Sequence, residues 1–213
     1  ALQHPKFKGK VYRLAELVLD VPSLIARLAE LAGDSLLAAE RIEPLREQQA
    51  LVGLRVDGRE IRAQRIVLSA GGGNAELLKQ LGISQPTQQL RPLHMVLAKG
   101  PALKPLYAHC LGGGPKPRVT VTTHPAADGQ WVWYLGGDLA EAEGVARDAA
   151  DQIKAAQKEM ADLLPWVDQA ATQWATLRVD RAEPDQSGLV RPDNAFLAEQ
   201  ESLLVGWTTK LAL

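Results

Sequence analysis

The sequence lacks most of the features that mark metal, disulfide or polyanion-binding proteins. Cys110 is the single cysteine among 213 residues, which excludes an intrachain disulfide and a metal site with several cysteine ligands. The formal net charge is −1, so no positive excess favours nucleic acid or an anionic membrane surface. No apolar run approaches the length of a transmembrane helix. We therefore expect no metal, no nucleic-acid partner and no transmembrane segment, and the lone cysteine fits a reducing cytoplasm.

The glycine pattern and the two ends of the sequence show further absences. No Gly-x-Gly-x-x-Gly occurs, although this fingerprint forms the phosphate-binding turn that opens dinucleotide-binding domains. The chain begins at Ala1 without Met and without the charged and apolar regions of a signal peptide. It stops at Leu213 without a polar tail. We expect both ends to be cuts in a longer polypeptide.

What is present indicates a folded protein, since 46% of the residues are hydrophobic and 23% are charged. In the first third, Asp20-Val21-Pro22-Ser23 precedes apolar residues at helical spacing, which predicts a helix with one buried face that ends at Gly33. Extended segments are predicted at residues 35–39, 41–45 and 50–56. Asp57-Gly58 then predicts a tight hairpin turn before a further strand.

The pattern of residues changes near Leu90. Short extended segments alternate there with glycine- and proline-rich turns, which predicts an antiparallel sheet. The predicted strands are residues 93–98, 119–123 and 131–135. One long helix is predicted from Glu143 to Leu164, ended by Pro165. Strands at 172–179 and 203–207 complete the expected elements.

Residues 66–74 carry the clearest chemical signal. A hydrophobic strand, Ile66-Val67-Leu68-Ser69-Ala70, runs into Gly71-Gly72-Gly73, and Asn74 follows as an expected helix cap. Glycines in this place let the main chain approach a ligand closely, and a helix start presents N–H groups to an anion. Both a nucleotide contact and a purely structural turn fit this pattern.

The order of these features resembles the D-amino-acid oxidase and glycerol-3-phosphate dehydrogenase superfamily of FAD-dependent oxidoreductases. The resemblance rests on the helix opened by Asp20-Val21-Pro22, the Asp57-Gly58 hairpin and residues 63–71. It continues through most of the chain. The downstream matches are residues 89–94, 135–138, 164–165, 177–178 and 204–210.

The resemblance implies an α/β (α+β) fold. A partial FAD/NAD(P)-binding Rossmann-like domain would be interleaved with a substrate domain built on an antiparallel β-sheet. The expected domains are residues 1–89 (FAD-binding, without its first strand, turn and helix), residues 90–176 (substrate-binding sheet and long helix) and residues 177–213 (a truncated return to the FAD-binding domain).

The resemblance also implies which residues meet the cofactor. The main chain of Ile42 would hold the adenine, and Ala70 and Gly71 would pass the adenosine and the pyrophosphate. Gly206 would lie in the strand that reaches the flavin ring. The full expected set is Ile42, Ala70, Gly71, Gly72, Gly206, Thr208 and Lys210. Since Gly72-Gly73-Asn74 replaces the small-Trp-Ser pattern of the family, no side-chain role carries over at these three positions.

Two residues are the expected catalytic candidates. By family position, Arg178 would bind a substrate carboxylate or phosphate through its guanidinium fork, although a surface ion pair with Asp180 or Glu183 would also explain it. His94 would serve as acid or base because an imidazole titrates near neutrality, although a hydrogen-bonded filler in a strand is the plainer alternative. The weaker candidates for Arg178's task are Arg181 and Arg191.

The implied function is part of an FAD-dependent oxidoreductase. It would oxidise a C–N or C–O bond of a small amino acid, amine, hydroxy acid or glycerol phosphate by hydride transfer to the flavin. The partners would be a small-molecule substrate and a peripheral electron acceptor, and the oligomeric state stays open. We expect the 213-residue chain alone to be inactive and to retain FAD weakly or not at all. The alternative is a non-catalytic α/β ligand-binding or interaction module.

Overall fold

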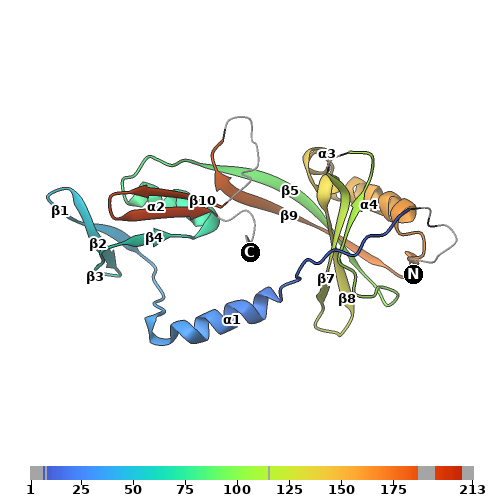
Figure 1. Ribbon diagram of the computed structural model, residues 1–213, viewed down its shortest axis with the longest axis horizontal. Coiled ribbons are helices and arrows are strands. Elements are labelled where there is room, and N and C mark those ends of the chain that lie inside the picture. Colours follow the sequence, from blue (N-terminus) through green and yellow to red (C-terminus); the bar gives the residue numbers. More distant parts are fainter. Residues whose placement is uncertain (1–6, 8, 115, 187–194, 208–213) are drawn as a thin grey trace. The chain divides into compact units, whose positions relative to one another are not determined.

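Each structural unit of the protein combines two stretches of the sequence. A computed structural model describes residues 7, 9–114, 116–186 and 195–207 (Figure 1). The sheet unit comprises Ala1–Val18 and Pro92–Val179, and the turn unit comprises Leu19–Arg91 and Asp180–Leu213. The units therefore change after residues 91 and 179, where the sequence places domain boundaries after 89 and 176. The segment that ends at Val18 groups with the sheet unit and not with the first predicted domain.

A five-stranded sheet forms the sheet unit, with the strand order β6-β7-β8-β5-β9. Strands β5 and β9, which are neighbours at one edge of this sheet, also contribute residues to the turn unit. The strands are β5 (Gln88–Lys99), β6 (Ala108–Leu111), β7 (Pro117–Pro125), β8 (Trp131–Gly136) and β9 (Gln173–Pro184). The Asp128-Gly129 turn joins β7 to β8, and Gly129 has a φ of 79° there. The predicted antiparallel pairing holds for β6–β7, β7–β8 and β5–β8.

Strict alternation along the strands builds the core of this unit, because successive strand side chains point to opposite faces. Most of its buried members come from β5, β7, β8 and the helix α4 (Ala149–Leu163), which lies beside the strands in Figure 1, and the others come from the segments that follow β5, β8 and α4. These are Val96, Ala98, Leu103, Val119, Val121, Trp133, Leu135, Leu139, Ala156, Met160 and Leu164.

The single long helix predicted over residues 143–164 is wrong. The segment forms a short helix, α3 (Ala142–Ala146), and then α4. Between them Asp148 takes an extended conformation and caps α4, because its side chain accepts a hydrogen bond from the Asp151 N–H at 2.8 Å. Aspartate is a favoured N-cap, so a new helix starts where the hydrophobic pattern alone suggested continuity.

The turn unit contains two three-stranded sheets and two helices. In one sheet the strands follow the order β1-β2-β3, and in the other the order is β10-β11-β4. The elements are α1 (Val21–Ala32), β1 (Ile42–Glu47), β2 (Ala50–Val56), β3 (Arg59–Arg62), β4 (Ile66–Leu68), α2 (Asn74–Gln80), β10 (Phe196–Gln200) and β11 (Leu203–Trp207). Strands β4 and β11 are parallel, which is the pairing that a Rossmann-like domain requires.

Local turn chemistry in this unit was predicted correctly in one place and missed in another. The Asp57-Gly58 hairpin is confirmed, with φ angles of 48° and 82°, the left-handed values that such a turn needs. The strand predicted at residues 35–39 is wrong, since Ser35 ends a 3-10 turn and residues 36–41 form no strand before β1 begins at Ile42. In the β1–β2 turn, Gln48 and Gln49 have positive φ angles. Glutamine is not among the residue types typical of such turns, so the sequence does not predict this one.

Helix α1 is confirmed, and it ends before Gly33 as expected, but the prediction that one face is buried is wrong. Leu24, Leu28 and Leu31 are 40%, 56% and 67% exposed, and no residue of α1 is buried. The spacing therefore predicted an amphipathic helix correctly, while the surface that would cover it is not supplied by the described residues.

Both units together confirm the α+β class, with helices packed beside mainly antiparallel sheets. The turn unit has its own core, which surrounds β4, β11 and α2. Its buried members are Leu51, Ile66, Leu68, Leu78, Leu81, Leu203, Val205 and Trp207.

Candidate functional site

The glycine-rich turn joins β4 to α2 in the turn unit. Residues Gly71–Gly73 form a single 3-10 turn, and Gly71 has a φ of 56°, where a side chain would be strained. A Cβ atom added to Gly71 or Gly72 would meet no atom within 4 Å. The main chain at these two glycines therefore borders open space and is not enclosed by side chains.

A cavity of about 290 Å³ opens beside this turn. Ser69 and Ala70 supply part of its wall, and Ile42 at the start of β1 supplies another part. The remaining lining is aliphatic: Leu54, Ile66, Val67, Leu68, Leu77 and Leu81. The structure thus brings together Ile42 and Ala70, two of the expected cofactor contacts, around a small, mainly apolar pocket.

Asn74 is the first residue of α2 and not the expected helix cap, because Gly73 occupies the cap position and no side chain caps the helix. The Asn74 side chain is fully buried. Its Oδ1 accepts a hydrogen bond from the Ala70 N–H at 2.8 Å, and its Nδ2 donates to the Gly206 carbonyl at 3.0 Å. Sequence reasoning missed this role. The available signal was an amide side chain, Asn74, that follows a buried strand and a glycine turn.

The turn also uses its own N–H groups. Ala70 N–H bonds to Asn74, the Gly73 N–H donates to the Ala70 carbonyl at 3.0 Å, and the Asn74 N–H donates to the Gly71 carbonyl. These three donors are engaged within the turn, and α2 has only seven residues. The predicted presentation of helix N–H groups to an anion stays a prediction, and Gly71 and Gly72 are the positions of the turn that border open space.

The remaining expected cofactor contacts follow β11. Gly206 lies in β11 opposite Leu197 of β10, and a Cβ atom there would come within 3.0 Å of the Leu197 side chain. Trp207 is buried in the core of the turn unit, and its indole N–H donates to the Gln88 side chain at 3.0 Å. Thr208 and Lys210 lie outside the described residues.

The two catalytic candidates belong to the sheet unit, where both hold the α3 segment. His94 is buried on the same face of β5 as Val96, and its Nδ1 lies 2.9 Å from the Gly144 carbonyl. Since a carbonyl only accepts, Nδ1 carries the proton in the neutral ring and Nε2 does not. Arg178 is exposed, and its guanidinium donates to the carbonyls of Val145 at 3.0 Å and Arg147 at 2.8 Å.

The contacts of Arg178 and His94 bear on whether each residue has a catalytic or a structural role. Among the described residues, Glu183 pairs with Arg91, and Arg178 instead donates to main-chain carbonyls, so the alternative of an ion pair with Asp180 or Glu183 is not what the structure shows. His94 has the environment of a hydrogen-bonded core residue. Arg181 lies half-buried on β9, and Arg191 lies outside the described residues. A catalytic role for any of these residues stays a prediction.

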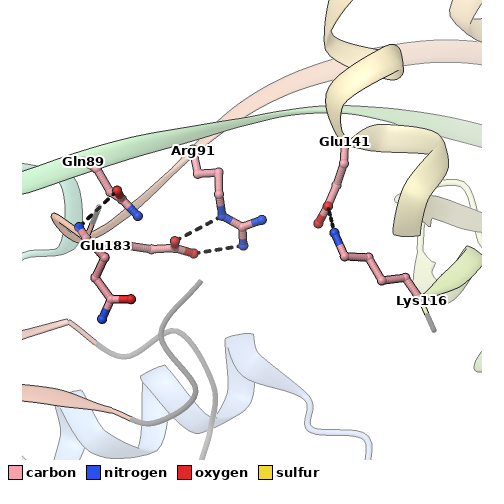
Figure 2. Close-up of polar contacts among 6 residues, drawn as sticks. Gln89, Arg91, Lys116, Glu141 and Glu183 are labelled. Atoms are coloured by element: carbon pink, nitrogen blue, oxygen red, sulfur yellow. Dashed lines mark hydrogen bonds and ion pairs between the residues drawn. The ribbon is translucent and has the colours of Figure 1, made fainter. Parts of the chain in front are cut away.

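A buried ion pair that sequence reasoning missed joins β5 to β9 within the turn unit. Figure 2 shows Arg91 directed at Glu183, with contacts of 3.1 and 3.2 Å to the two carboxylate oxygens. The Glu183 side chain is 1% exposed and that of Arg91 14%. The nearby Gln89 accepts from the Gln186 N–H at 3.3 Å. Each charged residue directly precedes a proline in its strand, which was the available signal.

The remaining ionisable groups of the described residues do not form a further candidate active site or metal site. Lys116 and Glu141 form an ion pair of 2.9 Å in the sheet unit (Figure 2), and burial raises the pKa of the Cys110 thiol above its usual range. Among the described residues, no cluster of three or more His, Cys, Asp or Glu side chains could bind a metal ion. Within the same residues, no helix has both the length and the apolarity to cross a bilayer.

Comparison with known proteins shows a relative that matches this chain over its full length. The chain is 72% identical over 213 residues to the probable FAD-dependent oxidoreductase PA4991 of Pseudomonas aeruginosa, and it spans 54% of that protein's length. The crystal structure of PA4991 matches with a TM-score of 0.92 over 98% of this chain and 58% of that chain. No family model matches the chain.

A glycine oxidase structure from Bacillus cereus ATCC 14579 covers 77% of this chain and 42% of its own, at 13% identity and a TM-score of 0.44. A likeness this low carries no argument about substrate or family. The expected resemblance to FAD-dependent oxidoreductases is confirmed by the PA4991 match, while the narrower superfamily stays a prediction. The chain is a close homologue of a probable FAD-dependent oxidoreductase and corresponds to about half of that protein's length.

Proposed function

We propose that the chain supplies cofactor- and substrate-binding parts of an FAD-dependent oxidoreductase. The reaction would be oxidation of a C–N or C–O bond in a small amino acid, amine, hydroxy acid or glycerol phosphate. The 72% identity to PA4991 supports the class. The observation that carries the proposal is the open main chain at Gly71 and Gly72 beside the pocket lined by Ile42 and Ala70.

The residues present fit a nucleotide cofactor. Bare main chain at a positive φ can approach a ligand more closely than any residue with a side chain, and here nothing fills the space in front of it. When bound, FAD supplies the acceptor for the hydride. The turn and the aliphatic pocket would then hold the adenosine part of the cofactor and exclude water from it.

Arg178 is the residue of this chain that we propose for substrate binding. Two of its N–H groups are committed to the carbonyls of Val145 and Arg147, which fixes the orientation of the guanidinium. Its other N–H groups leave donors for a carboxylate or phosphate. His94 is the weaker prediction, because packing and the Gly144 contact already account for its position.

A chimera tests the proposal directly. This chain would replace the 72% identical segment of PA4991, and the purified chimera would be examined for bound flavin and for anaerobic bleaching by amino acids, amines, hydroxy acids and glycerol phosphate. We expect a yellow protein that releases FAD on denaturation. A folded, colourless chimera that ignores added FAD would instead support a non-catalytic binding module.

Two smaller expectations accompany the proposal. The 213-residue chain alone should show no turnover and little quenching of flavin fluorescence when FAD is titrated. The peripheral electron acceptor and the cytoplasmic location stay predictions.

A further inference from the structure

The side-chain amides of Asn74 and Gln88 connect the glycine turn to the end of β11. In each amide the oxygen accepts one hydrogen bond and the nitrogen donates another. Asn74 accepts from the Ala70 N–H and donates to the Gly206 carbonyl. Gln88, at the start of β5, donates from Nε2 to the Gly72 carbonyl at 3.2 Å and accepts at Oε1 from the Trp207 indole. All of these residues belong to the turn unit.

The Asn74 amide continues a main-chain ladder. The parallel pairing of β4 with β11 ends at Leu68 opposite Val205. Beyond that point the two main chains no longer pair directly, and the Asn74 amide joins Ala70 to Gly206 with one acceptor and one donor. A carboxamide offers the same two groups as a peptide unit, so it can bridge strands that have begun to separate.

The bonds of Gln88 reach another residue of the turn, Gly72. Ala70 is fixed through its N–H and Gly72 through its carbonyl, so Gly71, at a φ of 56°, lies between two anchored neighbours. Both anchors lead to adjacent residues of β11. The turn therefore has its conformation set by side chains that do not line the pocket themselves.

We propose that Asn74 and Gln88 are positioning residues, which hold Ala70–Gly72 against Gly206 and Trp207 at the spacing needed for main-chain contact with the cofactor. The cofactor contact rests on the proposed function, whereas the clamp itself does not. A simple filling role is the alternative. In a filling role each amide would need hydrogen-bond partners, but the partners could lie anywhere. Here both amides bond to the same two segments, the turn and the end of β11.

The sharpest variant is Asn74→Asp, which keeps the acceptor for Ala70 but loses the donor for Gly206. A carboxylate oxygen would then face the Gly206 carbonyl at the position of Nδ2. We expect amide hydrogen exchange in residues 70–73 and 203–207 to become about tenfold faster or more in the 213-residue chain. In the chimera with PA4991, the dissociation constant of FAD should rise by a similar factor.

A matched control makes the same chemical change on the same helix. Gln80→Glu alters an exposed amide of α2 that donates to Glu76, and the like-charge contact it creates should cost only about 0.2–0.5 kcal/mol. It should leave exchange in residues 70–73 and FAD retention within about twofold of the original chain. Exchange in residues 96–99 of the sheet unit serves as the internal reference for global unfolding.

The introduced aspartate also gives a pH readout. Its protonated form carries an O–H that can donate to the Gly206 carbonyl, so mild acid should restore exchange protection factors in Asn74→Asp. The original chain and Gln80→Glu have no such group at this site and should show no gain. A residue that merely fills space would produce no rescue.

Gln88→Glu provides a second, independent variant should Asn74→Asp fail to fold. It keeps the acceptor for Trp207 but loses the donor for Gly72, so local exchange should again rise about tenfold. The inference is overturned if both variants leave residues 70–73 unchanged, or if exchange rises equally in residues 96–99. A colourless chimera of the unmutated chain would defeat the proposed function, while the exchange experiment would still decide the clamp.

Discussion

The sheet unit and the turn unit place their apolar side chains differently. In the sheet unit, one face of β5, β7 and β8 is covered by α4, and its buried polar groups are satisfied from within. Gln152 is an example, since it donates to the carbonyls of both His94 and Leu139. In the turn unit, a whole helix keeps its leucines exposed, and glycine main chain borders an open pocket.

This difference separates stability from binding. A close-packed core resists change, because each buried group already has its partners. Open main chain and exposed apolar surface are instead the features through which proteins make contacts. We infer that the core of the sheet unit supplies rigidity, which would hold Arg178 in place for a substrate, and that the turn unit supplies open surfaces for a cofactor or for further polypeptide.

The largest effect should come from the core of the sheet unit. Leu135 is fully buried, and its strand register places it between Val96 and Val121. Leu135→Ala should lower the free energy of unfolding by about 3–5 kcal/mol, because it removes buried carbon and leaves a cavity. Urea unfolding followed by circular dichroism measures this change.

The exposed Leu177 on β9 supplies the control. Leu177→Ala should change the free energy of unfolding by less than about 0.5 kcal/mol. A loss of similar size in both variants would mean that the sheet unit has no dominant core, and the comparison between the units would fail.

A somewhat smaller loss is expected at the ion pair of the turn unit. Glu183→Gln leaves the Arg91 guanidinium without its carboxylate in a largely dry place. Breaking a buried pair from one side costs roughly 3–5 kcal/mol, and we expect about 3 kcal/mol because Arg91 keeps some surface in water. The unfolding transition of the turn unit, followed by hydrogen exchange in β11, gives the measurement.

An exposed pair in the same unit is the matched control. Arg65 and Glu199 form an ion pair of 3.1 Å in which both side chains are more than half exposed. Glu199→Gln should therefore cost no more than about 0.5 kcal/mol. Equal effects of the two substitutions would show that Glu183 is hydrated in solution, contrary to its 1% exposure.

The parts of the fold that were predictable from the sequence are those set by local rules. The Asp57-Gly58 turn forces its hairpin, and the alternation in β7 and β8 gives a half-buried sheet. The break between α3 and α4 was missed because Asp148 acts as a cap only when its side chain turns back to Asp151. The spacing of hydrophobic residues does not show whether an aspartate side chain caps a helix.

The site shows the same division. Glycines after a buried strand predicted the open turn, because glycine adopts a φ like that of Gly71 at little steric cost. The anchoring roles of Asn74 and Gln88 were not predictable, since their partners at Gly206 and Trp207 lie 132 and 119 residues away. Burial of α1 was mispredicted because periodicity describes a helix but not the surface that covers it.

The smallest effect should come from α1, and it tests the comparison most directly. Leu28 is 56% exposed, so Leu28→Glu removes little apolar surface from a dry environment. We expect the free energy of unfolding of the 213-residue chain to change by less than about 0.5 kcal/mol. The same substitution at Leu78 of α2, which is 3% exposed, should unfold the turn unit, since it would bury a carboxylate. A loss at Leu28 approaching that at Leu78 would show that α1 is covered in solution, and the turn unit would then resemble the sheet unit in enclosing its own apolar residues.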